Sequence, residues 1–146
     1  MAQTFHGGIH IEENKNTASV AAVPFAEPKR VAISMQQHIG APCIPSVAVG
    51  DHVDIGQCIG DNPNALCCPV HASVSGTVVA IESRTGAMGA PITHVVIEND
   101  CQHTVTTTLK PVETALEELT AEEIVERVRA AGIAGMGGAA FPTYAK

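Results

Sequence analysis

Glycine and proline recur at short intervals between residues 40 and 91, and brief runs of valine, isoleucine and threonine lie between them. Such breaks disfavour a long helix, whereas β-branched runs favour strands. The strand candidates are residues 31–33, 44–49, 53–55, 58–59, 77–82, 92–98 and 105–108. Short strands at this spacing predict a mainly β fold, a small sandwich or barrel. The chain has no tryptophan and only three phenylalanines, so its core must come from valine, isoleucine and alanine.

The length and the rest of the composition restrict which class of protein this chain can belong to. A chain of 146 residues with 45% hydrophobic residues is the size of one domain with a true core. Its net charge of -7 argues against a nucleic-acid surface. No run is long and apolar enough to predict a transmembrane segment, and residues 1–10 lack the features of a secretory signal. The cysteines are therefore expected to be free thiols in a reducing compartment.

The cysteines and histidines form no familiar metal-binding pattern. The cysteines are Cys43, Cys58, Cys67, Cys68 and Cys101, with no CxxC pair among them. Because zinc and iron–sulfur sites usually draw on closely grouped ligands, we interpret these residues as buried or loop thiols and predict no metal site. His71, Ser73 and Ser75 are close in sequence but do not form a triad, because strand neighbours alternate faces. No catalytic residue is predicted in this chain.

The C-terminal part changes character. Thr120 and Glu123 have the spacing of a capping box, and Gly132 stands where a helix often ends, so the sequence predicts a helix over residues 121–131. A glycine-dense run follows over residues 132–143. This run lacks the spacing of a dinucleotide fingerprint or a Walker loop, and by itself it can be a plain turn or a phosphate cradle. Its position predicts that the chain is a fragment reaching just inside a second domain.

Residues 46–82 are similar to lipoyl and biotinyl domains, which are barrel-sandwich hybrid folds. In those domains a hairpin presents a lysine that carries the cofactor. The corresponding hairpin here, residues 61–70, contains no lysine, and no lysine or arginine occurs between Arg30 and Arg84. An amide-linked arm needs an amine, so we expect the fold without the carrier function, and no covalent lipoyl or biotin group.

An ordered set of short motifs resembles the N-terminal part of the C subunit of the Rnf complex, the ion-translocating ferredoxin–NAD oxidoreductase of bacteria. Each motif alone is weak, but the set runs in the right order along nearly the whole chain. The motifs are residues 5–10, 37–42, 49–53, 56–57, 69–78, 97–100 and 131–143.

The resemblance implies a function for the longer protein. That family is similar to the NADH- and FMN-binding subunit of respiratory complex I, in which a glycine loop lies against FMN and a lysine helps to hold the flavin. By position, the FMN-facing residues here would be Gly135, Gly137, Gly138 and Lys146. Ala140 departs from the pattern, since many relatives have glycine there. FMN, NAD(H) and two 4Fe-4S clusters are implied for the full-length protein, and no cofactor is expected in the fragment alone.

The same resemblance implies the organisation and the setting. We expect an irregular segment over residues 1–29 that packs on the β domain, a barrel-sandwich hybrid domain over 30–110, and a linker, helix and truncated α/β flavin-binding domain over 111–146. The expected partners are the other Rnf subunits, NADH and, indirectly, ferredoxin, at the cytoplasmic face of the bacterial membrane. Two alternatives remain: a relative of the A subunit of the sodium-pumping NADH–quinone reductase, and a barrel-sandwich binding or scaffold module without a redox role.

Overall fold

The computed structural model describes residues 11–86, 89–108, 115 and 118–146. The sequence motif at residues 5–10 and the predicted domain boundary at residue 110 lie outside these described residues. Within them the chain is mainly β, with one α-helix, α1 (Ala121–Ala130), and a 3-10 turn, η2 (Thr143–Ala145). No helix in this part of the chain has the length and hydropathy that a membrane crossing requires.

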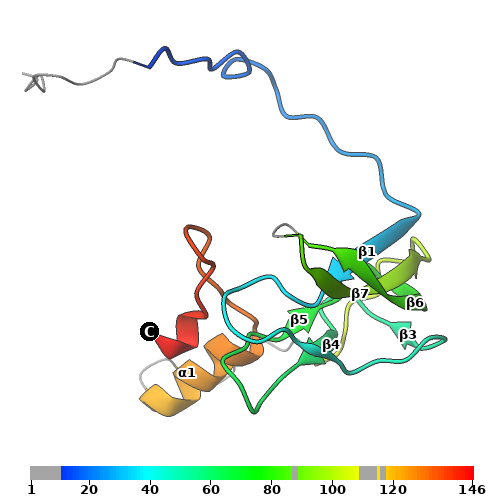
Figure 1. The fold of residues 1–146 in the computed structure, drawn as a ribbon, viewed down its shortest axis with the longest axis vertical. Helices are drawn as coiled ribbons and strands as arrows, with labels where there is room; N and C mark the ends of the chain where they lie inside the picture. The colour runs from blue at the N-terminus through cyan, green and yellow to red at the C-terminus, as the bar shows by residue number, and fades with distance from the viewer. Residues whose placement is uncertain (1–10, 87–88, 109–114, 116–117) are drawn as a thin grey trace, which may run out of the picture.

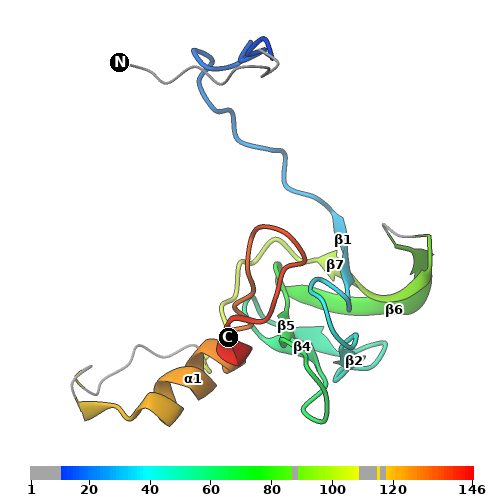
Figure 2. The same cartoon turned by 60° about the vertical axis from the view of Figure 1, so that its left-hand side comes forward.

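Two antiparallel sheets form the β domain (Figures 1 and 2). The larger has the strand order β1-β7-β6-β3, and the smaller has the order β2-β4-β5. The strands are β1 (Arg30–Ser34), β2 (Ile44–Pro45), β3 (His52–Val53), β4 (Cys58–Asp61), β5 (Val70–His71), β6 (Gly76–Thr85) and β7 (Pro91–Asn99). The long β6–β7 ribbon curls along its length, as Figure 2 shows. The prediction of a small, mainly β body is therefore confirmed.

The short strands depart most from the sequence prediction. Strand β2 ends at Pro45 instead of running to residue 49, because the chain turns where the Asp51 carboxylate accepts a hydrogen bond from the Ala48 amide (2.8 Å). Val105 forms only an isolated bridge with Ile55. Strand β5 is two residues long and was not predicted, since pairing with β4 rather than local composition defines it.

Gly76 is the position where the larger sheet depends on glycine. It opens β6 with φ +151, a region that residues with a side chain rarely adopt. A Cβ atom there would collide with the carbonyl oxygen of Glu98 on the neighbouring strand β7. Gly76 also pairs with Val53 of β3. Its missing side chain therefore lets three strands meet at one corner.

The core lies between the two sheets and is built from small and medium side chains. Its members are Ile33, Met35, Cys43, Val53, Ile59, Cys67, Val70, Ala72, Val78, Val95 and Ile97. Valine and isoleucine supply most of this core, as the composition predicts. Two cysteines belong to it as well, so their thiols are held away from solvent among apolar neighbours.

Among residues 11–29, the recorded contacts with the β domain lie only at residues 27–29. Residues 11–26 are exposed and extend away from the body, as Figure 1 shows. The contacts come from the Glu27 carboxylate and the Pro28 carbonyl, which both accept from the Asn99 amide group (3.0 Å each). Within residues 11–26, the large apolar side chains are exposed: Ile11, Val20, Val23 and Phe25. The packing expected for the whole segment is thus not seen for residues 11–26.

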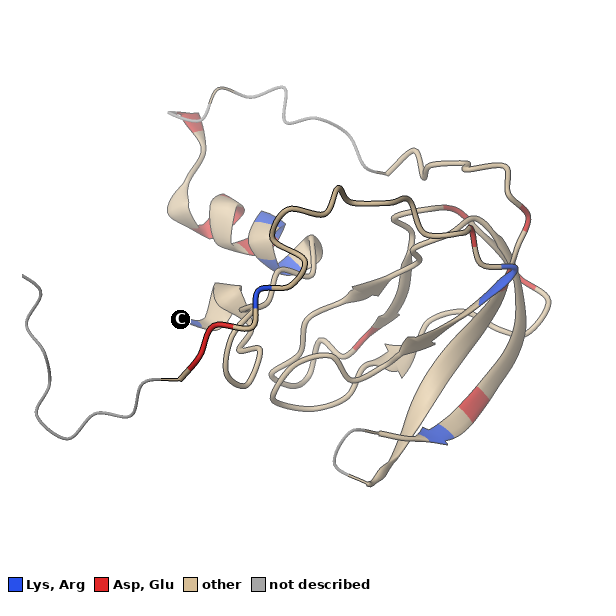
Figure 3. Ribbon diagram, turned by 90° about the horizontal axis from the view of Figure 1, so that it is seen from above, with Lys and Arg blue, Asp and Glu red and all other residues tan. Residues whose placement is uncertain are grey.

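Charged residues are sparse along the β domain, as the colours of Figure 3 show. Its flanking cations are paired: Arg30 with Glu98 (3.4 Å) and Arg84 with Glu82 (2.6 Å). Helix α1 carries more charged residues. Its first turn is acidic and its last turn is basic, so each end carries the charge that the helix dipole favours there.

Candidate functional site

Helix α1 begins at the capping box that the sequence predicts. Thr120 Oγ1 accepts from the Glu123 amide (3.2 Å), and the Glu123 carboxylate accepts from the Thr120 amide (2.8 Å). The helix ends one residue earlier than predicted, with Ala131 as its C-cap. Gly132 follows at φ +67, and its amide donates to the Arg129 carbonyl (2.8 Å). This left-handed glycine turns the chain back toward the β domain.

An ion pair fastens the last turn of α1 to the smaller sheet. Arg129 Nη2 donates to both carboxylate oxygens of Asp61, the last residue of β4, at 2.9 and 3.0 Å. The two side chains are only 18% and 28% exposed. The guanidinium carbon also lies 5.8 Å from the centre of the Tyr144 ring. Because the pair is partly buried and charge-assisted, it contributes more than a solvated surface pair.

The glycine loop, residues 132–143, rests on the same corner of the β domain. The Ile39 amide donates to the Ala139 carbonyl (2.9 Å), which joins the turn after β1 to the loop. The Cys67 amide donates to the Tyr144 hydroxyl (3.4 Å) just beyond the loop. The glycine loop, α1 and the segment before β5 therefore meet at one place, and Figure 2 shows the C-terminal segment beside the β domain there.

The four residues that the resemblance assigns to FMN lie in and just after this loop. Lys146 Nζ is 3.6 Å from the position of a Cβ on Gly135, so these two residues come together. Gly137 and Gly138 have open space where their side chains would stand, and Gly138 has φ +59. In the described part of the chain, the amides of these two glycines form no backbone hydrogen bond. Free amides, open space and a nearby cation fit a phosphate-bearing flavin.

Ala140 has φ +50, a left-handed conformation that costs a residue with a side chain about 1–2 kcal/mol. The departure from the pattern that the resemblance implies therefore falls at a strained position. We expect Ala140→Gly to stabilise the glycine loop by about 1 kcal/mol. Hydrogen exchange of the Ile39 amide, which donates to the loop, should slow about fivefold. The matched control is Ala139→Gly, whose site has no positive φ; an equal or larger gain there would contradict the assignment of strain to Ala140.

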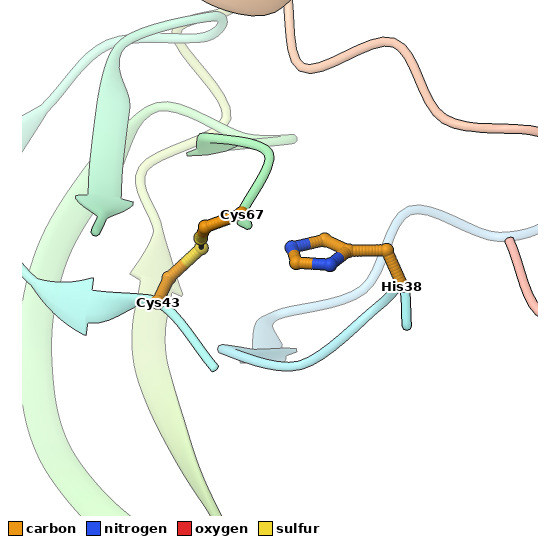
Figure 4. Close-up of side chains that lie close together, drawn as sticks. All are labelled: His38, Cys43 and Cys67. Atoms are coloured by element: carbon orange, nitrogen blue, oxygen red, sulfur yellow. Dashed lines mark hydrogen bonds between the residues drawn. The ribbon is translucent and has the colours of Figure 1, made fainter. Parts of the chain in front are cut away.

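Beneath the glycine loop lies a cluster that the sequence analysis missed. His38, Cys43 and Cys67 are buried, and one donor atom from each lies within 4.8 Å of the others (Figure 4). The Sγ atoms of Cys43 and Cys67 are 3.1 Å apart. Burial raises the pKa of the Cys43 thiol well above its usual range, and the Cys67 thiol adds to this. The two cysteines are 24 residues apart in sequence, so no spacing rule could pair them.

An iron–sulfur cluster does not fit this chain. All five cysteines lie among the described residues, and the one group of potential ligands there contains two of them. Cys58 and Cys101 are exposed, and the Cys68 thiol donates away from the pair, to the Ile133 carbonyl (3.5 Å). A 4Fe-4S cluster needs four thiolates around one centre. The described part of the chain does not provide them.

Ser75, Asp100 and His52 form a second polar group. Ser75 Oγ donates to Asp100 Oδ1 (2.6 Å), and His52 Nε2 lies 3.0 Å from Asp100 Oδ2. The carboxylate stands between the hydroxyl and the imidazole, so no base activates the serine, and the group is not a nucleophilic triad. The hydrogen bonds from Ser75, from the Gln102 amide and from His52 lower the pKa of Asp100 to about 2.

This lowered pKa predicts an acid-sensitive turn. A carboxyl group with a lower pKa when folded stabilises the protein above its unfolded pKa of about 4 and loses that contribution as the pH falls. We therefore expect stability to drop between about pH 4 and pH 2, and Asp100→Asn to flatten that drop. Urea unfolding midpoints at several pH values measure it. Parallel curves for the two proteins would mean that Asp100 is not the responsible group.

Comparisons with known proteins agree with one another. The family model described as "RnfC Barrel sandwich hybrid domain" matches residues 3–102. Over 98% of its length the chain is 45% identical to the C subunit of the Na(+)-translocating ferredoxin:NAD(+) oxidoreductase complex of Acetobacterium woodii. It is 35% identical, over 100% of its length, to the C subunit of the proton-translocating ferredoxin:NAD(+) oxidoreductase complex of Clostridium ljungdahlii.

A third relative is the C subunit of the ion-translocating oxidoreductase complex of Vibrio cholerae, 36% identical over 97% of the chain. The matched region is 32% of the first two relatives and 18% of this third one. The chain thus spans a third or less of the length of these curated relatives.

Proposed function

Since the chain belongs to the RnfC barrel-sandwich hybrid family, we propose that it is the N-terminal portion of an electron-transfer subunit in an ion-translocating ferredoxin–NAD oxidoreductase complex. The observation that supports this most is the combination of the β domain with a glycine loop seated on it, matched along the whole chain by the C subunits of such complexes. The names of these relatives favour this reading over the A subunit of the sodium-pumping NADH–quinone reductase.

The β domain serves this protein as a structural and docking module. Strands β4 and β5 pair with one another, and the hairpin that joins them has no lysine to carry a lipoyl or biotinyl arm. Its tightly packed corner instead carries α1 and the glycine loop. The domain's role is therefore to hold the start of the cofactor-binding part in a fixed place, and to contact the other subunits of the complex.

The glycine loop and Lys146 form one side of an FMN site in the full-length protein. Bound FMN would exchange electron pairs with NAD(H) and single electrons with iron–sulfur clusters that lie elsewhere in the complex. The part of this chain is binding and orientation. Gly137 and Gly138 leave room for the flavin and offer free amides, and Lys146 places a positive charge beside Gly135.

The test is Gly137→Val in the full-length protein. Gly137 does not have a positive φ, and its Cβ would point into open space, so valine does not strain the loop itself. We expect the variant to lose FMN, with occupancy at least tenfold lower, because the added side chain fills the space that the flavin needs. FMN per polypeptide and NADH–acceptor activity measure this loss.

Two further variants make this test specific. Lys146→Gln should weaken FMN binding while the protein stays folded. Lys15→Gln, on the exposed N-terminal segment, should change neither FMN binding nor folding. The thermal unfolding midpoint of Gly137→Val should match that of the parent. Full FMN occupancy with normal activity in Gly137→Val would show that the glycine loop is only a hinge.

The same proposal places the protein peripherally at the cytoplasmic face of the bacterial membrane, among the other subunits of the complex. NADH is its direct substrate, and ferredoxin reaches it through another subunit. The relatives' names support membership of such a complex, since each is named as the C subunit of one.

A further inference from the structure

Three potential metal ligands converge from three separate segments of the chain. His38 lies in the turn after β1, Cys43 directly precedes β2, and Cys67 lies in the hairpin before β5. Their donor atoms all lie within 4.8 Å of one another, and Figure 4 shows the imidazole edge directed at the two sulfurs. The exposed fractions are 7%, 4% and 0% respectively. Such convergence inside the core results from the fold and not from a local sequence motif.

The histidine is held in the tautomer that a metal requires. Its Nδ1 is 3.0 Å from the Ile39 carbonyl oxygen, which can only accept, so Nδ1 carries the proton. The lone pair is then on Nε2, at the edge of the ring that faces the cysteines. A backbone carbonyl that fixes the second ring nitrogen is the usual support of a metal-bound histidine. Nε2 now accepts from the Cys68 amide (3.0 Å), which a bound cation would displace.

The donor set selects the kind of cation. Two thiolates and one neutral imidazole balance the charge of a divalent ion, so the bound group would be neutral within an apolar core. Sulfur and nitrogen donors without a carboxylate suit zinc rather than magnesium or calcium. Tetrahedral zinc holds its sulfurs about 3.8 Å apart, from Zn–S bonds of about 2.3 Å. The 3.1 Å separation seen here therefore has to open by about 0.7 Å.

We propose that His38, Cys43 and Cys67 form a zinc site that ties the turn after β1 to the smaller sheet beneath the glycine loop. The Cys68 carbonyl oxygen, 3.0 Å from Cys43 Sγ and 3.7 Å from Cys67 Sγ, is placed to fill or to support the fourth position. On binding, the two thiols lose their protons to solvent and no electron is transferred. The displaced Cys68 amide then faces thiolates, which are better acceptors than thiols.

The zinc site would act on structure rather than on electron transfer. The amides of Cys67 and Ile39 donate to the C-terminal segment, at Tyr144 and Ala139, and add to the Arg129–Asp61 ion pair. A cation that fixes His38 and Cys67 would fix these neighbours as well. The donor geometry alone supports this zinc site, whether or not FMN binds at the glycine loop.

The experiment uses the 146-residue chain, reduced, stripped of metal and handled without oxygen. Zinc is titrated against a chromophoric chelator, and bound zinc is counted by elemental analysis. We expect one zinc per chain. Cys43→Ser and Cys67→Ser should each bind at least about 100-fold more weakly, because each removes one of three protein ligands. His38→Gln should lose a similar amount.

Cys58→Ser is the matched control. Cys58 is a free thiol on strand β4 of the smaller sheet, but it is exposed, and its thiol donates to the Gly60 carbonyl (3.5 Å) instead of joining the cluster. This variant should keep one zinc with unchanged affinity, as should Cys101→Ser at a second exposed thiol. Equal binding by Cys67→Ser and Cys58→Ser would overturn the assignment of ligands.

A second measurement uses only the parent chain, so its result does not depend on whether a variant folds. Cobalt(II) added to the parent chain should give the visible bands of a tetrahedral ion and the thiolate charge-transfer bands of two sulfurs, and zinc should abolish both. Absence of these bands and of tight zinc binding in the reduced protein would overturn the proposal. So would a mass lower by two hydrogens with Cys43 and Cys67 unreactive to alkylation, because the pair would then be a disulfide.

Discussion

Gly76→Ala is expected to lower the free energy of unfolding by roughly 3 kcal/mol or more. The backbone at φ +151 costs a residue with a side chain about 1–3 kcal/mol. The new Cβ would also collide with the Glu98 carbonyl oxygen on β7, and a backbone atom within a sheet cannot move aside without disturbing its strand pairing. Denaturant unfolding followed by circular dichroism measures the change.

Gly50→Ala is the matched control for this prediction. Gly50 also has a positive φ, +99, but no atom lies within 4 Å of the position of its Cβ. It should therefore cost the strain alone, about 1–2 kcal/mol. Equal losses in the two variants would mean that β3, β6 and β7 do not meet at Gly76 as closely as described.

Gly132→Ala is expected to release the C-terminal segment from the β domain. Its added Cβ would collide with the Pro69 carbonyl oxygen and crowd the His71 ring (3.2 Å). We expect a local loss of about 2 kcal/mol, seen as hydrogen exchange about 30-fold faster at the Ile39 amide, which donates to the glycine loop. The β domain should remain folded, because its core does not include Gly132.

The control here is Gly138→Ala. Gly138 has nearly the same backbone conformation, φ +59 against +67, but open space around its Cβ position. The two variants therefore carry the same strain, and only one of them collides with the β domain. If hydrogen exchange at the Ile39 amide rises equally in both variants, backbone strain in the loop explains the effect, and the collision with Pro69 does not.

The elements that could be predicted from the sequence are those whose signals are local. Strands β6 and β7 have long β-branched runs, and α1 has its capping box, so each was expected within a few residues of where it lies. Strand β5 could not be found in this way. Two residues have no periodicity, and β5 exists because β4 lies beside it.

The candidate site also has one part that the local sequence predicts and one part that it does not. The glycine loop was visible because glycine is dense there, although nothing local revealed that Ala140 would hold a left-handed conformation. The cluster of His38, Cys43 and Cys67 was interpreted as separate thiols and a scattered histidine. Its members meet only because the turn after β1, the residue before β2 and the hairpin before β5 come together at the smaller sheet, in which β2 and β5 both pair with β4. That convergence depends on strand order, which no spacing of cysteines encodes.

The sparse charge of the β domain determines how its contacts should respond to ionic strength. Residues 31–83 contain no lysine or arginine, and the flanking Arg30 and Arg84 are each paired with a glutamate. Salt at 0.1 M screens exposed charges beyond about 10 Å, but it has little to screen on such a surface. A neighbouring protein held through the β domain should therefore stay bound as salt is raised, whereas one held through the acidic start of α1 should dissociate. Washing an assembled complex with increasing salt would separate these two modes of attachment.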